Sequence, residues 1–176
     1  HGECVEPLDE ASLREGLQAA YAGGLRSVAI VFMHGWRYTA HEAAAGRIAR
    51  DVGFTQVSTS HRTSPMMKFV SRGDTTVVDA YLSPILRRYV DQVAREMPGV
   101  RIFFMQSSGG LTDAGAFQGK DAILSGPAGG IVGMARTAAL AGHGRVIGFD
   151  MGGTSTDVSH YAGEFEREFE TQVAGV

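Results

Sequence analysis

The sequence predicts an α/β fold, and three observations point to it. Segments with helical periodicity alternate with short apolar segments rich in β-branched residues through most of the 176 residues. Apolar residues make up 44% of the chain and charged residues 20%, a balance typical of a globular protein rather than a disordered one. Glycine accounts for 24 residues, roughly twice the usual share, and its clustering indicates tight turns and close backbone contacts.

The first elements follow from periodicity and punctuation. Leucine, alanine and tyrosine recur at helical spacing over residues 7–24, with Asp9 as a candidate N-cap and a Gly-Gly pair at the end. Residues 26–33 form a β-branched run that predicts a buried strand, and residues 55–59 predict a short second strand.

A helix between these strands is predicted to begin with a capping box. The Thr39 hydroxyl and the Glu42 carboxylate are spaced to satisfy free amides of the first turn, and Gly53 ends the helix. His41 and Glu42 also begin the zinc-binding pattern HExxH, but position 45 is alanine, so capping is the favoured role of Glu42.

The next segment is predicted to be a loop followed by a long helix. Residues 60–73 lack periodicity, and Asp74 is placed to cap a helix over residues 75–97. Pro84 lies inside that helix and predicts a kink or a break. Arg72, like the other basic residues nearby, is expected at the surface.

The second half continues the alternation. Residues 128–140 predict a helix with Pro127 at its start. Strands are expected on both sides of it, the last three antiparallel, at residues 101–105, 145–149, 157–161 and 164–170.

Composition excludes several classes of function. The net charge of −3 gives no basic surface for nucleic acid or an anionic membrane. The single cysteine excludes an internal disulfide, and the longest apolar stretch, residues 27–33, is too short to cross a bilayer.

No signal peptide opens the chain, so we expect a cytoplasmic protein. Because the sequence begins without methionine, we also expect a piece of a longer polypeptide.

The strongest chemical signal is an acid-flanked double glycine. An apolar strand ends in Asp150, Gly152 and Gly153 turn the chain, three hydroxyl residues follow, and Asp157 begins the return strand. Glycine amides can form an anion-binding nest, and a carboxylate beside a phosphate requires a divalent cation between them. A simple hairpin turn is the alternative. Neither the GxxxxGK[ST] loop nor GxGxxG before a helix is present.

Four stretches in order carry a resemblance to a known family. DMGGTSTD at residues 150–157 resembles the phosphate loop of the hydantoinase A and 5-oxoprolinase family, within the superfamily of sugar kinases, chaperone ATPases and actin. Residues 79–84 resemble its NAYLSP motif, with Asp in place of Asn. Residues 105–111 resemble MQSxGGL, and residues 125–130 resemble SGPAGG.

The resemblance implies two ribonuclease H-like lobes that close on ATP. Residues 1–72 would be the C-terminal part of the first lobe, and residues 73–176 the N-terminal part of the second, hydantoinase A, lobe with its phosphate hairpin. The first lobe of the family carries its own DxGGT loop, which has no counterpart in residues 1–72. The chain would therefore hold half of the phosphate site and be inactive alone.

The resemblance also implies an ATP-dependent hydrolase that opens a cyclic amide or imide, such as a hydantoin or 5-oxoproline, with a hydantoinase B-type partner subunit or fused domain. ATP and Mg²⁺ would be the cofactors, with Asp150 a metal ligand and Asp150 and Asp157 the catalytic carboxylates. The residues assigned to phosphate are Gly152, Gly153, Thr154, Ser155 and Thr156. A non-enzymatic ATP-binding switch and an acetone carboxylase-type subunit are the alternatives.

Two further segments have competing interpretations. Gln106, Ser107 and Ser108 follow a predicted strand, where ligands gather in α/β sheets, so they are candidates for substrate binding; a solvated turn explains them equally well. The small residues of 125–130 favour close helix packing over direct ligand contact.

Overall fold

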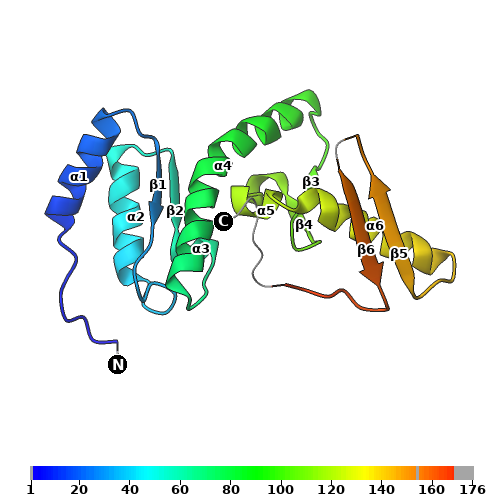
Figure 1. The fold of residues 1–176 in the computed structure, drawn as a ribbon. Helices are drawn as coiled ribbons and strands as arrows, with labels where there is room; N and C mark the ends of the chain where they lie inside the picture. The colour runs from blue at the N-terminus through cyan, green and yellow to red at the C-terminus, as the bar shows by residue number, and fades with distance from the viewer. Residues whose placement is uncertain (1, 154, 169–176) are drawn as a thin grey trace. The chain divides into compact units, whose positions relative to one another are not determined.

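The computed structural model describes residues 2–153 and 155–168 and has a mixed α/β fold, as predicted (Figure 1). The chain divides into two compact units, each described here by itself. Unit 1 comprises His1–Asp91 with Gln118–Lys120, and unit 2 comprises Gln92–Phe117 with Asp121–Val176. Within the described ranges, no helix is long and apolar enough to cross a membrane.

Unit 1 is built around a parallel pair of strands. Its elements are, in order, α1 (Glu10–Ala22), β1 (Ser27–Ile30), α2 (Ala40–Val52), β2 (Gln56–Thr59), α3 (Ser60–Thr63) and α4 (Phe69–Glu96), of which the last continues beyond the unit. Strands β1 and β2 pair in register from Ser27↔Gln56 to Ile30↔Thr59. The apolar core joins α1, α2 and the strands, and consists of Leu17, Ile30, Ala45, Ile48, Ala49 and Phe54.

Two helix ends in unit 1 form as the sequence predicts. The Asp9 carboxylate accepts a hydrogen bond of 3.0 Å from the Ser12 amide and caps α1. Gly53 ends α2 with φ 118°, a left-handed conformation that side chains rarely adopt. A Cβ at Gly53 would also lie 3.1 Å from the Tyr21 ring, so both geometry and space favour glycine there.

Two predictions for the middle of the chain are wrong. Neither member of the capping box caps α2, because the Thr39 side chain makes no capping bond and the Glu42 carboxylate turns into the core. Residues 60–73 are largely helical rather than a loop, and α4 begins at Phe69, so Asp74 lies inside the helix. Pro84 lies inside a continuous α4 that bends along its length in Figure 1, which agrees with the predicted kink and not with a break.

Unit 2 consists of two antiparallel hairpins and a glycine-rich helix. Strand β3 (Phe103–Met105) pairs with the unpredicted β4 (Leu111–Asp113), and β5 (Val146–Met151) pairs with β6 (Thr156–Tyr161). The short helices η1 (Ala114–Ala116) and α5 (Gly119–Ala122) precede α6 (Ser125–Leu140). The strand predicted at residues 164–170 is absent from 164–168, and the last two positions lie outside the described residues.

Helix α6 packs closely on both hairpins of unit 2. A Cβ at Gly129 would lie 3.5 Å from Met105 Cγ on β3. A Cβ at Gly148 on β5 would collide with the Met134 sulfur on α6 and the Ser159 hydroxyl on β6. The small residues in α6 therefore permit close helix packing, as expected from the sequence.

Candidate functional site

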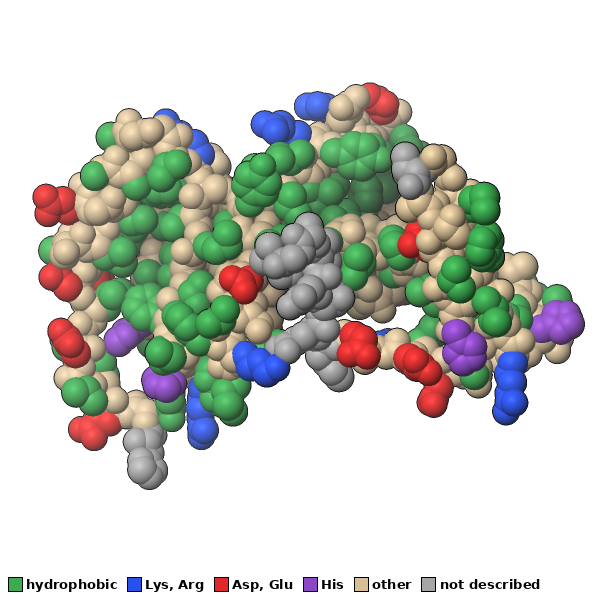
Figure 2. All heavy atoms as spheres, viewed as in Figure 1, with side chains coloured by type: hydrophobic (Ala, Val, Ile, Leu, Met, Phe, Trp, Pro, Cys, Tyr) green, Lys and Arg blue, Asp and Glu red, His purple; other side chains and the backbone are tan. Residues whose placement is uncertain are grey.

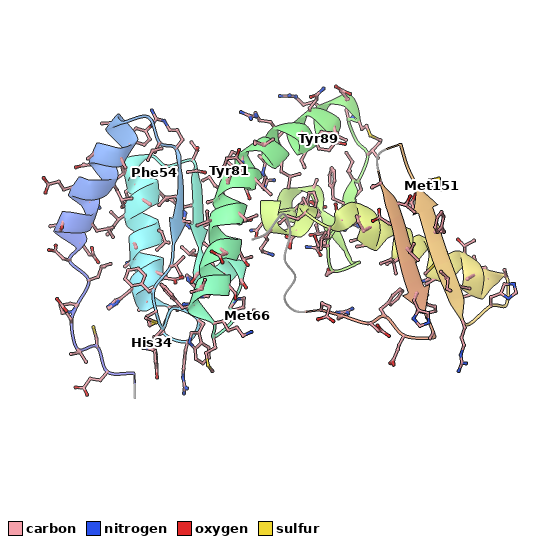
Figure 3. All side chains as sticks on the ribbon, in the orientation of Figure 1. His34, Phe54, Met66, Tyr81, Tyr89 and Met151 are labelled. Atoms are coloured by element: carbon pink, nitrogen blue, oxygen red, sulfur yellow. The ribbon has the colours of Figure 1, made fainter. Side chains whose placement is uncertain are left out.

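The hairpin of β5 and β6 places the two predicted catalytic carboxylates opposite each other. Asp150 pairs with Asp157 in the antiparallel register, and both residues are exposed. Directly opposed residues have Cβ atoms about 4.5–5.5 Å apart, so the carboxylates share one face of the hairpin. That face is the one toward α6, since a Cβ at Gly130 would lie 3.8 Å from Asp150 Oδ2. Met151, labelled in Figure 3, marks the loop end of this hairpin.

In the turn after β5, one glycine amide is hydrogen-bonded within the turn, and a second has no partner among the described residues. The Gly152 amide donates 3.0 Å to the Ser155 carbonyl and closes the turn. The Gly153 amide has no hydrogen-bond partner among the described residues, and a Cβ at that glycine would meet open space. Thr154 lies outside the described residues. An anion nest at this turn would therefore use the Gly153 amide and not that of Gly152.

Strand alternation separates the other predicted hairpin residues. Thr156 pairs with Met151, and His160 pairs with Ile147. Because successive side chains point to opposite faces, both lie on the face away from the carboxylates. The phosphate role of Thr156 remains a prediction.

The two carboxylates fit a cation that is held jointly with a ligand. Like charges directly opposed on a hairpin are unfavourable, and a cation between them would relieve the repulsion. The described residues contain no group of three or more His, Cys, Asp or Glu side chains able to hold a metal. Mg²⁺ is commonly bound through one or two carboxylates plus nucleotide phosphates, so Asp150 and Asp157 suit that ion better than one requiring a complete protein cage.

The predicted substrate residues lie in the loop between β3 and β4, where Ser107 is already engaged. Its hydroxyl donates 2.8 Å to the Asp121 carbonyl and accepts 3.0 Å from the Leu124 amide. The loop is therefore fastened to the start of α6. The Ser108 hydroxyl accepts a long bond of 3.4 Å from Gly110, and Gln106 closes the loop through its backbone amide. Substrate binding by Gln106, Ser107 and Ser108 remains a prediction.

Unit 1 contains a buried charge network that the sequence did not reveal. The Glu42 side chain is 0% exposed. Its Oε1 accepts from the Phe32 amide at 2.9 Å and the Ser60 hydroxyl at 2.5 Å, and its Oε2 accepts from the His61 amide at 2.9 Å and His61 Nδ1 at 2.7 Å. Burial raises the pKa of Glu42, but these hydrogen bonds, led by that from Ser60, outweigh it and lower the pKa below its usual value.

Arg72 is the cationic member of the network and is wrongly predicted to lie at the surface. It is 0% exposed. Its Nε donates 2.9 Å to the Ser60 hydroxyl, and its two Nη atoms donate to backbone carbonyls, those of Phe32, Met33, Met66 and Met67. Ser60 therefore links the buried carboxylate to the buried guanidinium.

A second buried carboxylate lies in the segment that resembles NAYLSP. Asp79 is 3% exposed and accepts hydrogen bonds from the Ser58 hydroxyl at 2.6 Å, the Ser83 hydroxyl at 3.1 Å and the Lys120 amide at 3.2 Å. The Ser83 hydroxyl in turn accepts 2.9 Å from the Gly119 amide. This motif thus anchors residues 118–120 to α4.

The mixed α/β fold carries a hairpin in which two carboxylates lie opposite each other beside a glycine turn. These features indicate a protein that binds an anion together with a cation, and comparison with protein families makes the class more specific. The model described as Hydantoinase/oxoprolinase matches residues 72–176, and the Hydantoinase/oxoprolinase N-terminal region matches residues 1–53. The chain belongs to the hydantoinase/oxoprolinase family.

Curated relatives and solved structures agree with this assignment. The 5-oxoprolinase of Saccharomyces cerevisiae is 46% identical over 183 residues, and 5-oxoprolinase 1 of Arabidopsis thaliana is 43% identical over 176 residues. These matches cover 99% and 97% of this chain, which spans only 14% of the length of each relative.

The crystal structure of the ATP-dependent caprolactamase from Pseudomonas jessenii matches with a TM-score of 0.78 and 32% identity, covering 90% of this chain and 24% of that one. A nucleotide-free acetone carboxylase structure has the same TM-score at 23% identity, covering 92% and 24%, and shows similarity of fold alone.

Proposed function

We propose that this chain is part of an ATP-dependent enzyme that opens a cyclic amide, and that the hairpin of β5 and β6 forms half of its nucleotide-phosphate site. The observation that carries the proposal is the register of Asp150 directly opposite Asp157 on an exposed hairpin face. Two opposed carboxylates beside a glycine turn have little structural value, whereas they suit a cation bound with phosphate.

Each part of the hairpin has a separate task in this proposal. Asp150 and Asp157 would coordinate Mg²⁺ and fix its position, and the Gly153 amide would donate a hydrogen bond to a phosphate oxygen. ATP, when bound, supplies the driving force for activating the unreactive amide carbonyl. Close packing of Gly148 against α6 fixes the hairpin, so that the carboxylates are positioned before the ligand binds.

The finer parts of the proposal concern the whole protein. The two relatives described above are named 5-oxoprolinases and exceed the caprolactamase in identity, so 5-oxoproline or a related lactam is the proposed substrate. Ribonuclease H-like lobes are proposed for the complete fold. A caprolactamase relative is named as an alpha subunit, which supports a partner subunit or fused domain of the hydantoinase B type.

The test measures ATP consumption and ring opening together in the full-length protein with 5-oxoproline. We expect Asp150→Asn to reduce kcat by at least about a hundredfold, since it removes a preorganised charge at the phosphate site. His160→Gln, on the opposite face of the same hairpin, is the matched control and should retain normal turnover.

Near-normal ring opening by Asp150→Asn would contradict the assignment of the hairpin. ATP turnover that needs no small-molecule acceptor would instead favour a switch module, and turnover that depends on acetone would favour a carboxylase-type subunit.

A further inference from the structure

The carboxyl ends of the parallel strands β1 and β2 meet at one edge of unit 1. The segments that follow them, residues 31–39 and 60–68, therefore lie at the same end of the unit. Figure 3 labels His34 and Met66 there, one from each segment. Ligands of open α/β sheets bind outside the carboxyl ends of the strands, so this edge is a natural place for a second site.

His61 is oriented at this edge by the buried carboxylate of Glu42. An ionised carboxylate only accepts hydrogen bonds, so the 2.7 Å contact with Glu42 Oε2 places a proton on His61 Nδ1. Nε2 has no partner among the described residues. In this part of the chain no buried side-chain nitrogen or oxygen lacks a partner, so the unpaired Nε2 must reach the surface. The side chain as a whole is 15% exposed.

The charges around His61 favour an anion. The negative charge of Glu42 is fully buried, takes four hydrogen bonds, and is linked through Ser60 to Arg72. Residues 31–41 and 60–73 contain arginine, lysine and histidine but no Asp or Glu. Figure 2 shows His and Lys or Arg side chains at this lower end of unit 1. Two acidic residues of the N-terminal segment, Glu3 and Glu6, lie on either side of Cys4 in the sequence, and Cys4 contacts His41 rather than His61.

We propose that this edge is a binding site for a small carboxylate anion, with protonated His61 donating a hydrogen bond from Nε2 and Glu42 holding the ring in place. Both Glu42 and Arg72 have their polar atoms satisfied within the protein, so His61 is the member of the network with an atom left for a ligand. As a site for the carboxylate of a cyclic amide substrate, it rests on the proposed function; as an anion site, it stands on unit 1 alone.

The test is calorimetric titration of the full-length protein without ATP, using three probes. 5-Oxoproline carries a carboxylate, 2-pyrrolidinone has the same ring without it, and inorganic phosphate is an anion of another source. We expect 5-oxoproline to bind at least about tenfold more tightly than 2-pyrrolidinone, the contribution of one hydrogen bond between charged groups. Tighter binding of phosphate would overturn the carboxylate assignment.

His61→Asn separates a binding role from a structural one. The asparagine amide can still donate toward Glu42 but has no group in place of Nε2. We expect it to weaken 5-oxoproline binding at least about tenfold while leaving 2-pyrrolidinone unchanged, and His143→Asn, in unit 2, to change neither.

Unchanged 5-oxoproline affinity in His61→Asn, or equal loss for both lactams, would overturn the proposal. Because these titrations contain no ATP, they test carboxylate binding alone. 5-Oxoproline that binds in this way but is not opened when ATP is added would count against the proposed function only.

Discussion

The two units differ in the burial of the charged side chains that characterise them. In unit 1, Glu42 and Arg72 are completely buried, and both have hydrogen-bond partners within the protein. In unit 2, Asp150 and Asp157 are exposed, opposed and of like sign. Buried charges are tolerated only when they are satisfied, whereas exposed like charges that face each other cost stability unless something else binds them.

This difference separates the residues that hold the fold from those that we propose to bind a ligand. Glu42 joins α2 to the segments that follow β1 and β2, and Arg72 joins α4 to the same segments. The network therefore connects several elements of unit 1. The Asp150–Asp157 pair connects only two adjacent strands that already share a ladder of hydrogen bonds.

The largest effect should come from removing the buried cation. Arg72→Gln leaves backbone carbonyls and the Ser60 hydroxyl without a donor, and it removes the guanidinium that Ser60 links to Glu42. We expect the free energy of unfolding of unit 1 to fall by about 3–5 kcal/mol, measured by urea denaturation at neutral pH. Arg62→Gln replaces an exposed arginine nearby and should change the free energy of unfolding by less than about 0.5 kcal/mol. Equal effects of the two substitutions would show that the buried network does not stabilise unit 1.

Glu42 should make the stability of unit 1 depend on acid pH. Because the pKa of Glu42 is lowered in the folded protein, its contribution is complete above the ordinary value of 4.5 and is lost as the pH falls through the folded value. Glu42→Gln should lower the free energy of unfolding by about 2–3 kcal/mol at pH 7. The reason is that the NH₂ group of the new side chain would face two donors of His61, its backbone amide and Nδ1. The variant should also lose less stability than the wild type between pH 7 and pH 3.

The matched control for this pH dependence is Glu15→Gln, which replaces an exposed glutamate on α1. It should retain the acid dependence of the wild type. If urea midpoints of Glu42→Gln and the wild type fall in parallel with pH, Glu42 does not carry the dependence.

The sequence predicted what depends on local pattern. Alternation of apolar segments identified every strand except β4. Asp9 and Gly53 marked helix ends correctly because these caps depend on neighbouring residues alone. The Asp150–Asp157 hairpin was also visible, because both acids lie within one short turn. Its ligand chemistry is not visible from pattern and remains a proposal.

The sequence missed what depends on contacts between distant segments. Glu42 matched a local capping box, yet its carboxylate binds residues 18 and 19 positions later. A signal was present: Glu42 lies three and seven positions before the buried Ala45 and Ala49, on the apolar stripe of α2. Arg72 similarly lies four and eight positions before Thr76 and Ala80, but only if α4 begins earlier than Asp74 suggests.

The smallest effect should have the opposite sign and tests the carboxylate pair. Asp157→Asn removes the like charge opposite Asp150, so we expect unit 2 to become more stable by up to about 1 kcal/mol in the absence of divalent cation. Mg²⁺ should stabilise the wild type and have less effect on the variant, because one of the two ligands has lost its charge. Thermal unfolding with and without Mg²⁺ measures both changes, with Glu166→Gln as a control at an exposed acid outside the hairpin. Destabilisation by Asp157→Asn without Mg²⁺ would mean that this aspartate holds the hairpin together, and the contrast between the two units would then disappear.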